Sequence, residues 1–360
     1  MNLIFITMDG LRRDRIDKVP SLHALAKESL FFSGLITAAP YTIASMHALF
    51  SGTYPSRNGV DAYYNMFKFD KKFKTLAEYM KDAGRVCRAD VINDSVLPRQ
   101  GFDVFEIHDE NKDNLAERHC RILEEIKSNK SFFLYLHYSN IHTKLIRDVQ
   151  KPYNDFTKEF FSQPADNEKR YDSYMQDCEA YLKSVLDKLK ELAMLKNMVI
   201  VVVSDHGVSL GEKEGERMYG SFVFDYTLKT FCIMRVPDVL GKEVPWQAST
   251  VDILPTILEV FGMKRDEKYE YPDGSSLLTL KKDRTVFSET GGLGGPWPSQ
   301  KAHNVFCARL PAAKAIYYKT PGKWEFYNLK NDPKERNPRN RPSNELEESL
   351  MNSMKERYHI

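Results

Sequence analysis

Met198-Val199-Ile200-Val201-Val202-Val203-Ser204-Asp205-His206-Gly207 is the stretch that decides the fold class. Its first six residues are apolar and mostly β-branched, which is typical of a strand covered on both faces in a parallel sheet. Leu3–Met8 and Phe132–His137 are similar runs, and polar residues follow each of them. Helical patterns lie between the runs, at Ser21–Leu30, Lys74–Ala83, Asn114–Ser128 and Tyr171–Leu195. This alternation predicts an α/β, doubly wound, mostly parallel sheet flanked by helices.

The composition changes after Val251–Gly262, a short helical pattern that ends in glycine. Beyond it, charged segments with proline and glycine separate short expected strands and a final helix, at Arg284–Ser288, Ala315–Lys319, Trp324–Asn328 and Glu345–Tyr358. We therefore expect an α/β domain over residues 1–264. A small C-terminal antiparallel-sheet subdomain over residues 265–360 is expected to pack on it.

The overall composition is that of an ordinary globular protein, with 42% hydrophobic and 28% charged residues. A net charge of +2 over 360 residues gives no bulk attraction to nucleic acid or to an anionic membrane. No apolar run approaches the roughly 20 residues of a membrane span, and the apolar N-terminal run is too short for a signal peptide. We expect no nucleic-acid partner, no membrane span and a cytoplasmic location. The five cysteines are dispersed and contain no C-x-x-C pair, which indicates reduced structural thiols.

Chemically useful side chains follow the predicted strands. Ligands of doubly wound sheets bind beyond the carboxyl ends of the strands, where Asp9, Asn140–His142, Asp205 and His206 are expected. Carboxylates with an imidazole are suited to a divalent cation, which beside Thr42 would lower the pKa of its hydroxyl and polarise an ester oxygen. Taken singly, such an Asp or Thr is more often a cap or turn residue, so the prediction depends on their occurrence together.

Six motifs occur in an order that is typical of one family. They are N-L-I-F-I-T-M-D-G-L-R-R-D at Asn2–Asp14, V-P-S-L-H-A-L-A at Val19–Ala26, S-G-T-Y-P and N-G-V within Ser51–Val60, S-D-H-G-V-S-L-G at Ser204–Gly211, V-D-I-L-P-T-I-L-E-V-F-G at Val251–Gly262 and F-Y-N-L-K-N-D-P-K-E at Phe326–Glu335. In these motifs the chain resembles the sulfatase branch of the alkaline phosphatase superfamily along nearly its whole length. The resemblance implies that fold.

The resemblance also implies site roles. Asp9, Asp205 and His206 match the family's metal ligands, and Thr42 lies in the position of the nucleophile, ten residues before the glycine of the T-G motif. The set, with the Thr42 oxygen, is expected to bind one divalent metal ion, with Mn²⁺ or Zn²⁺ favoured and Mg²⁺ or Ca²⁺ possible. His142 resembles the substrate-side histidine that protonates the leaving group or binds a non-bridging oxygen. A core or capping histidine is the alternative for His142.

Two departures from the family pattern concern the reaction. Sulfatases carry C-x-P-S-R or S-x-P-S-R, whose first residue becomes formylglycine, but this frame reads Thr42-Ile43-Ala44-Ser45-Met46. Threonine cannot be converted to that aldehyde. The G-K-W-H segment that supplies a lysine and a histidine to sulfate is also absent from Val86–Arg99. The threonine instead resembles the phosphodiesterase, phosphonate monoester hydrolase and phosphoglycerol- or phosphoethanolamine-transferase branches.

Two other departures concern the number of metal ions. Tyr219 replaces a histidine of two-metal members, and Gly10 replaces the second acid of the sulfatase D-D opening, so one metal ion is favoured. A single ion leaves phosphoryl charge for other groups to neutralise. The side chains expected to bind substrate are Arg12, Asn93, Lys144, Lys213, Arg217 and Tyr219, with His47 as a further candidate near the pocket. A solvated surface charge is the alternative for each cation.

The sequence therefore predicts a metal-dependent hydrolase of phosphoesters, whether phosphodiesters, phosphomonoesters or phosphonate esters. Its substrate is expected to be a small-molecule or glycan-linked ester of phosphate type. Thr42 would form a covalent phosphothreonine that water releases. Three alternatives stay open: a phosphoryl transferase to a glycan or metabolite, a sulfatase with a nucleophile other than formylglycine, and a non-catalytic binding protein on this fold.

Overall fold

The computed structural model describes residues 1–63, 66–150, 158–216, 218–292 and 294–360. Its centre is an eight-stranded sheet. In spatial order the strands are β5 (Val104–Ile107), β4 (Val86–Val91), β6 (Phe132–Tyr138), β1 (Asn2–Met8), β7 (Met198–Val203), β8 (Cys232–Arg235), β2 (Leu30–Phe32) and β9 (Lys242–Val244). The first five are parallel, β8 runs antiparallel to both β7 and β2, and β9 is parallel to β2.

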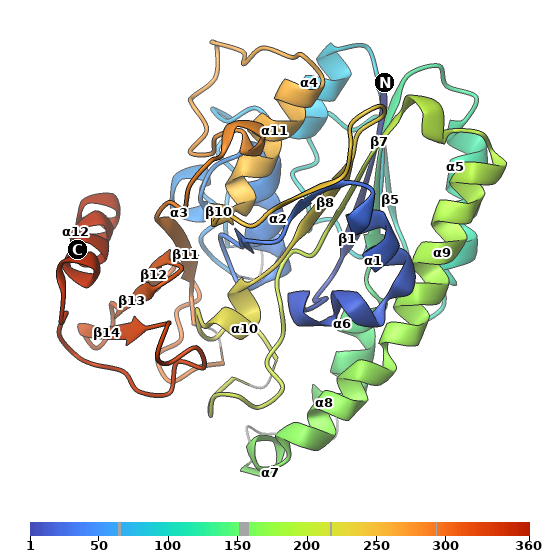
Figure 1. The fold of residues 1–360 in the computed structure, drawn as a ribbon. Helices are drawn as coiled ribbons and strands as arrows, with labels where there is room; N and C mark the ends of the chain where they lie inside the picture. Colours follow the sequence, from blue (N-terminus) through green and yellow to red (C-terminus); the bar gives the residue numbers. More distant parts are fainter. Residues whose placement is uncertain (64–65, 151–157, 217, 293) are drawn as a thin grey trace.

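Helices cover both faces of this sheet (Figure 1). One face is packed by α1 (Pro20–Lys27), α5 (Leu115–Ile126), α8 (Pro164–Ser173) and α9 (Met175–Glu191). The opposite face is packed by α2 (Thr42–Ser51), α4 (Leu76–Asp82) and α11 (Ile253–Val260). Shorter helices are α3 (Pro55–Asn58), α6 (Asn140–Leu145), α7 (Lys158–Ser162) and α10 (Asp225–Leu228). All six residues of β7 are buried, because helices cover it on both sides.

The C-terminal part forms a second, antiparallel sheet. Its strands are β11 (Val286–Thr290), β12 (Val305–Leu310), β13 (Ala313–Tyr318) and β14 (Lys323–Asn328), and α12 (Glu345–Tyr358) packs on β12 and β13. A two-stranded pair of β3 (Leu35–Ile36) and β10 (Ala248–Ser249) lies beside β11. The predicted fold class, a mostly parallel sheet flanked by helices with a small antiparallel sheet, is confirmed. The division at residue 264 stays a prediction.

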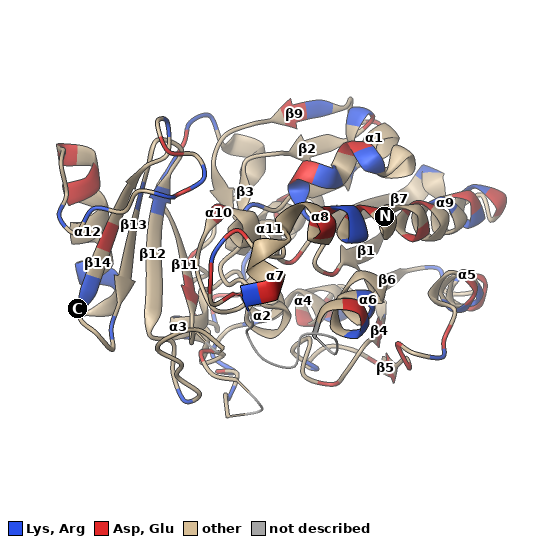
Figure 2. Ribbon diagram, turned by 90° about the horizontal axis from the view of Figure 1, so that it is seen from below, with Lys and Arg blue, Asp and Glu red and all other residues tan. Residues whose placement is uncertain are grey.

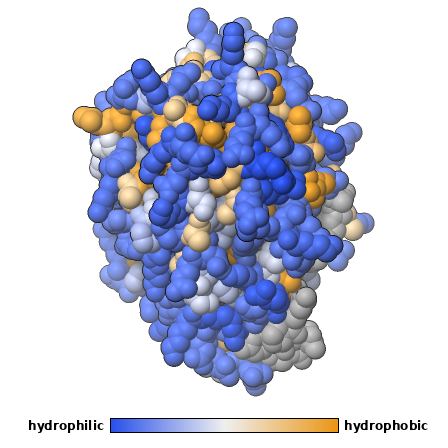
Figure 3. Space-filling view, turned by 90° about the vertical axis from the view of Figure 1, so that its right-hand side faces the viewer, coloured by the Kyte–Doolittle hydropathy of each residue, from blue (hydrophilic) through white to orange (hydrophobic). Residues whose placement is uncertain are grey.

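Charged residues of both signs are interspersed along the outer helices (Figure 2). The face that carries α5 and α9 is mostly hydrophilic, with apolar side chains gathered toward its upper part (Figure 3). Within the described residues, no helix is long and apolar enough to cross a membrane.

The helix expected at Tyr171–Leu195 is divided in the structure. α8 begins earlier, at Pro164, and ends at Ser173, and α9 follows after Tyr174. The backbone N–H groups of Tyr174 and Asp177 bond three residues back at this junction, which tightens the helix locally. The strand β12 was not predicted, because Arg309 interrupts its apolar pattern.

Candidate active site

Asp9 and Asp205 meet at the carboxyl end of the sheet because their strands are paired in register. β1 and β7 are parallel neighbours with Thr7 opposite Val203, so the residues two positions further lie side by side. Asp9 is only 1% exposed, and Asp205 and His206 are fully buried. The Nε2 atom of His206 lies 3.5 Å from Oδ2 of Asp205 and 3.8 Å from Oδ1 of Asp9. We call Asp9, Asp205 and His206 the acidic cluster.

Thr42 brings a hydroxyl to this acidic cluster. It is the first residue of α2, and its Oγ1 lies 3.2 Å from Nε2 of His206 and 3.4 Å from Oδ1 of Asp9. The hydroxyl of Ser45 donates to the carbonyl of Asp205 at 2.8 Å, which fixes the start of α2 against the loop after β7. Tyr41, the N-cap residue, makes no side-chain cap bond. The first N–H groups of α2 therefore have no side-chain acceptor from the cap, an arrangement that suits an anion.

The atoms of the acidic cluster fit a divalent cation. Nδ1 of His206 donates to the carbonyl of Gly207 at 2.8 Å, so the lone pair of Nε2 faces Thr42 and Asp9. Oδ1 of Asp205 accepts from the N–H groups of Gly10 and His206, at 3.0 and 2.9 Å. Oδ2 of Asp205 is buried and has no hydrogen-bond partner among the described residues, which is costly for a carboxylate unless a cation binds it.

The two carboxylates differ electrostatically. For Asp205, burial and the negative charge of Asp9 both raise the pKa. For Asp9, burial also acts to raise the pKa, but a hydrogen bond from His137 and the charges of His142, His137 and His206 outweigh it and lower the pKa to about 2. Asp9 is thus held ionised beside a second buried acid, and a bound cation would relieve the repulsion between them.

His137 is a contact of this site that the sequence did not single out. It is the sixth residue of β6, opposite Thr7 of β1, and its Nε2 lies 3.0 Å from Oδ2 of Asp9. The hydroxyl of Tyr135 lies 3.3 Å from its other ring nitrogen. The available signal was an imidazole near the carboxyl end of a strand adjacent to β1. Because Nε2 donates to Asp9, His137 orients a carboxylate of the acidic cluster.

The rings of Tyr219 and His142 lie on the side of His206. The ring of Tyr219 lies 4.5 Å from that of His206 and 5.9 Å from that of His142, measured between centroids. Nδ1 of His142 is 3.5 Å from Oε2 of Glu110, a long ion-pair contact. Burial acts to lower the pKa of His142, but Glu110 and the charge of Asp9 outweigh it and raise the pKa. Their roles toward substrate stay predictions.

The described cations expected to bind substrate are paired outside the acidic cluster. Arg12 binds Asp14 and Glu212, with its Nη2 2.9 Å from Asp14. It lines a cavity of about 690 Å³ that is not lined by the acidic cluster or Thr42. The ammonium of Lys144 pairs with Asp177.

The ammonium of Lys213 donates to the carbonyl of Glu335 and lies 4.5 Å above the ring of Phe224, which directs it toward the C-terminal part. Arg12, Lys144 and Lys213 would have to leave these partners to bind substrate, and substrate binding by them stays a prediction. Arg217 lies outside the described residues.

Asn93 and His47 lie on another loop and on α2. Oδ1 of Asn93 accepts from the backbone and hydroxyl of Ser95, at 3.0 and 2.9 Å, which closes a local turn on an exposed segment. His47 donates from Nδ1 to the carbonyl of Ile43 at 2.8 Å, and burial lowers its pKa to about 4. Its ring borders a separate cavity of about 510 Å³ rather than the acidic cluster.

Comparison with known proteins agrees with this geometry. A sequence profile described as Sulfatase matches residues 1–263. The chain belongs to the sulfatase family. Proteins of this family are metal-dependent, in agreement with the acidic cluster at the sheet edge.

Relatives of this sulfatase-family chain include proteins named for two activities. An ulvan-active sulfatase of Formosa agariphila is 26% identical over 294 residues, which cover 74% of this chain and 53% of the relative. The low-salt glycan biosynthesis sulfotransferase Agl7 of Haloferax volcanii is 24% identical over 352 residues, covering 90% of this chain and 72% of the relative. The chain thus spans about half the length of the first relative.

Solved structures of the family share the fold. The putative sulfatase yidJ from Bacteroides fragilis has a TM-score of 0.78 and 18% identity, covering 99% of this chain and 95% of that one. The phosphonate monoester hydrolase of Agrobacterium radiobacter has a TM-score of 0.77 and 15% identity, covering 99% and 94%. At these identities the likeness concerns the fold alone.

Proposed function

We propose that this sulfatase-family chain is a hydrolase of phosphate-type esters, either phosphodiesters, phosphomonoesters or phosphonate esters, with Thr42 as its nucleophile. The observation that carries the proposal is the position of Thr42, whose Oγ1 lies 3.2 Å from Nε2 of His206 at the start of α2. A threonine in the position of the formylglycine precursor retains its hydroxyl. Direct attack by that hydroxyl suits phosphorus, which forms a covalent phosphothreonine.

Asp9, Asp205 and His206 are the residues that would hold a divalent cation. Such a cation supplies charge neutralisation at the ester oxygens and a lower pKa for the Thr42 hydroxyl. The backbone N–H groups at the start of α2, which the side chain of Tyr41 does not cap, point their dipoles favourably at the same oxygens. Oδ2 of Asp205 is buried and accepts no hydrogen bond from the described residues, so its lone pairs can serve this role.

The chain's own residues can carry the two chemical steps. The deprotonated oxygen of Thr42 forms a bond to phosphorus as the bond to the leaving oxygen breaks on the opposite side. His142, with a raised pKa, donates a proton to the leaving oxygen. Water then attacks phosphorus and passes a proton to the ring of His142, as the bond from phosphorus to Oγ1 of Thr42 breaks. This returns Thr42 and His142 to their starting states and releases the product.

A second candidate function is sulfuryl transfer to a glycan hydroxyl. The relative that is named as a glycan-biosynthesis sulfotransferase aligns with 90% of this chain and with 72% of its own length. In that reaction Thr42 would accept the sulfuryl group, or orient it, and an acceptor hydroxyl would replace water. The same site would serve, so the two functions differ in the transferred group and in the acceptor.

The test is a turnover panel of p-nitrophenyl esters of phosphate, phenylphosphonate, a phosphodiester and sulfate, with Mn²⁺ or Zn²⁺ added. We expect turnover of at least one phosphorus ester, and a loss of about 1000-fold or more in kcat for Thr42→Ala. Thr42→Ser is the matched control, because it keeps a hydroxyl and is expected to retain activity within about tenfold.

Turnover of the sulfate ester alone would reject the phosphoester assignment. Turnover of any ester that persists in Thr42→Ala would reject Thr42 as nucleophile. Sulfuryl transfer is tested separately, with p-nitrophenyl sulfate as donor and simple sugars as acceptors.

A further inference from the structure

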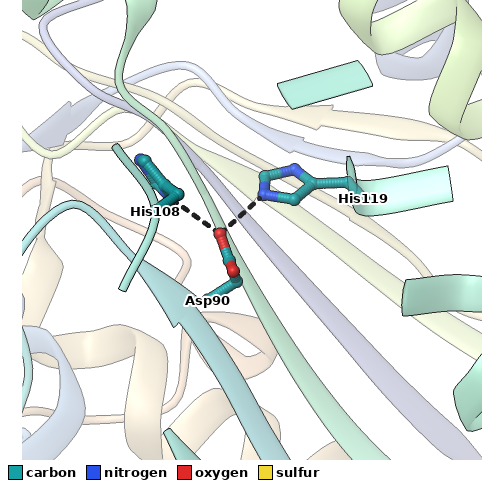
Figure 4. Close-up of side chains that lie close together, drawn as sticks. All are labelled: Asp90, His108 and His119. Carbon is teal, nitrogen blue, oxygen red and sulfur yellow. Dashed lines mark hydrogen bonds and ion pairs between the residues drawn. The ribbon is translucent and has the colours of Figure 1, made fainter. Parts of the chain in front are cut away.

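A second group of buried ionisable side chains lies outside the acidic cluster, with two histidines on either side of a carboxylate (Figure 4). Asp90 is near the end of β4, His108 follows β5, and His119 lies on α5. Asp90 and His119 are fully buried, and His108 is 2% exposed. Arg118 reaches Asp90 from α5. We call these four residues the Asp90 cluster.

Hydrogen bonds fix the protonation pattern of the Asp90 cluster. Oδ1 of Asp90 accepts from Nδ1 of His108 at 2.6 Å and from Nε2 of His119 at 3.1 Å. Oδ2 accepts from Nε and Nη2 of Arg118, both at 2.7 Å. A carboxylate that receives four donors is held ionised, so each ring carries its proton on the nitrogen that faces Asp90.

Two imidazoles and a carboxylate are also a common ligand set for transition metals. Here Arg118 already supplies the positive charge that balances Asp90. Both oxygens of Asp90 have partners, whereas Oδ2 of Asp205 has none in the part of the chain that the structure describes. The hydrogen-bonded arrangement is therefore complete without a cation.

The free nitrogen of His108 reaches the segment that carries His142. Its Nε2 lies 3.0 Å from the hydroxyl of Ser139 and accepts from it in the tautomer whose proton is on Nδ1. Ser139 is the N-cap residue of α6, where a serine hydroxyl usually accepts from the first turn of the helix. In this helix the serine makes no cap bond. Its hydroxyl is used by His108 instead, which ties the start of α6 to Asp90.

Glu110, the ion-pair partner of His142, is connected to the Asp90 cluster through the main chain. Glu110 lies two residues after His108, and its Oε2 is 3.5 Å from Nδ1 of His142. The hydroxyl of Thr143 donates to that same oxygen at 2.6 Å and lies 3.2 Å from the carbonyl oxygen of Ser139. The Asp90 cluster thus holds both the loop of Glu110 and the helix of His142.

We propose that Asp90, His108 and Ser139, anchored by Arg118, are positioning residues that place His142 and Glu110 against the leaving group of the ester. The inference rests on the proposed function, in which His142 donates the proton. None of the positioning residues contacts the substrate in this mechanism. They act by fixing the start of α6, so their loss changes proton donation more than it changes substrate binding.

His119 provides a matched control within the same cluster. Its Nδ1 accepts from the hydroxyl of Tyr181 on α9 at 2.8 Å. The ring of Tyr181 also stacks on that of Tyr138, directly before Ser139, at 4.2 Å between centroids, and a phenylalanine at position 181 keeps that ring contact. Ser139→Ala and Tyr181→Phe each remove one buried hydroxyl from a histidine of the Asp90 cluster. If the Asp90 cluster only stabilised the fold, the two substitutions would have similar effects on α6. If the cluster positions α6, only Ser139→Ala should change that helix.

The first measurement compares kcat on aryl phenylphosphonates whose leaving phenols become steadily less acidic. A poor leaving group depends more on general acid catalysis, which contributes about 100- to 10000-fold in total. We expect Ser139→Ala to lower kcat by less than about twofold with p-nitrophenol as the leaving group and by about tenfold with p-methoxyphenol. KM should change by less than about twofold. Tyr181→Phe should leave the leaving-group dependence unchanged.

The second measurement needs no turnover. Hydrogen–deuterium exchange of the amides of α6 should be faster in Ser139→Ala and unchanged in Tyr181→Phe, with the metal-loaded protein in both cases. If the wild type cleaves no phosphorus ester of any kind, the proposed function fails, and the exchange comparison alone still tests whether Ser139 holds the start of α6. Equal leaving-group dependence and equal exchange in both variants would overturn it. A second tightly bound metal ion in the wild type that is lost in His119→Ala would also overturn it, in favour of a metal site.

Discussion

At the scale of single residues, His137 sets the orientation of a carboxylate in the acidic cluster. Its Nε2 donates to Oδ2 of Asp9 at 3.0 Å, whereas Oδ1 of Asp9 is the oxygen that lies 3.8 Å from Nε2 of His206. Oγ1 of Thr42 lies 3.4 and 3.5 Å from the two oxygens. The hydrogen bond therefore assigns one oxygen of Asp9 to the protein and leaves the other for a cation. Removing the donor would let the carboxylate turn and would leave a buried lone pair unsatisfied.

We expect His137→Ala to weaken binding of Mn²⁺ by about 10- to 100-fold, the usual cost of losing a residue that orients a metal ligand. Isothermal titration calorimetry of the metal-free protein measures this change. His137→Gln is the control, since its amide can again donate to Asp9, and it should recover part of the affinity. An unchanged Kd in His137→Ala would show that Asp9 needs no such support, or that the cation binds elsewhere.

At the scale of elements, the sequence predicted the strands that are continuous apolar runs, and it did not predict β4 and β12, each of which contains a buried charge. β1, β6 and β7 are continuous apolar runs and were predicted nearly to the residue. β4 contains Asp90 and β12 contains Arg309, both buried. Arg309 is stabilised by Asp225, with contacts of 2.9 and 2.7 Å, from a helix 84 residues away. A local pattern cannot reveal a partner so distant in sequence.

The same limit applied to the candidate site. Asp9, Thr42, Asp205 and His206 could be predicted because each belongs to a motif at the end of a strand or the start of a helix. The structure brings all four together. Contacts made by His137 and by the pair of Glu110 and His142 depend on strand order and on loop placement, which the sequence did not specify.

The loop after β7 supplies a prediction about pH. Glu216 is fully buried, accepts from the N–H groups of Ser221 and Phe222 at 2.9 Å each, and accepts from the hydroxyl of Tyr226 at 2.5 Å. Burial raises its pKa from 4.5 to about 8 despite these hydrogen bonds. Between those pH values the folded state binds more protons than the unfolded state. The free energy of unfolding therefore falls as pH rises, by at most about 1.4 kcal/mol per pH unit from this group.

We expect Glu216→Gln to flatten this slope between pH 5 and pH 8. The free energy of unfolding of the variant should therefore increase relative to that of the wild type as pH rises. Urea unfolding at a series of pH values measures the difference. Glu214→Gln is the control, because Glu214 is exposed on the same loop and its substitution should leave the slope unchanged. Parallel pH profiles for the wild type and Glu216→Gln would mean that the carboxyl is ionised in the folded protein.

At the scale of the whole molecule, the C-terminal sheet is joined to the candidate active site. The hydroxyl of Tyr41, directly before Thr42, lies 2.7 Å from Nε2 of His303. Nδ1 of His303 lies 3.1 Å from Oε2 of Glu289 on β11, and all three side chains are buried. The N–H of Glu289 also donates to the carbonyl of Ala38 at 3.0 Å. The start of α2 is thus held from the C-terminal side as well as by the central sheet.

An apolar core crosses the expected boundary at residue 264. From the N-terminal side it contains Ile36, Phe222, Val223, Phe224 and Leu228, and from the C-terminal side Val286, Val305, Cys307, Ile316, Tyr318, Tyr327 and Leu329. Asp225 is buried beside it and is balanced by Arg309 and by Lys314, whose Nζ lies 2.6 Å away. Cutting the chain at the boundary would expose this apolar surface and leave a buried acid without its main cations.

We therefore expect residues 1–264 alone to lack cooperative unfolding, because the loss of this core and of the Asp225 pairs removes several kilocalories per mole from a marginal total. Near-ultraviolet circular dichroism and Mn²⁺ titration measure the loss, and the control is co-expression of residues 265–360 as a separate chain, which should restore both. A fragment of residues 1–264 that unfolds cooperatively and binds Mn²⁺ like the full chain would establish it as an independent domain. The positioning of Thr42 would then depend on the central sheet alone, and the contact between Tyr41 and His303 would be dispensable.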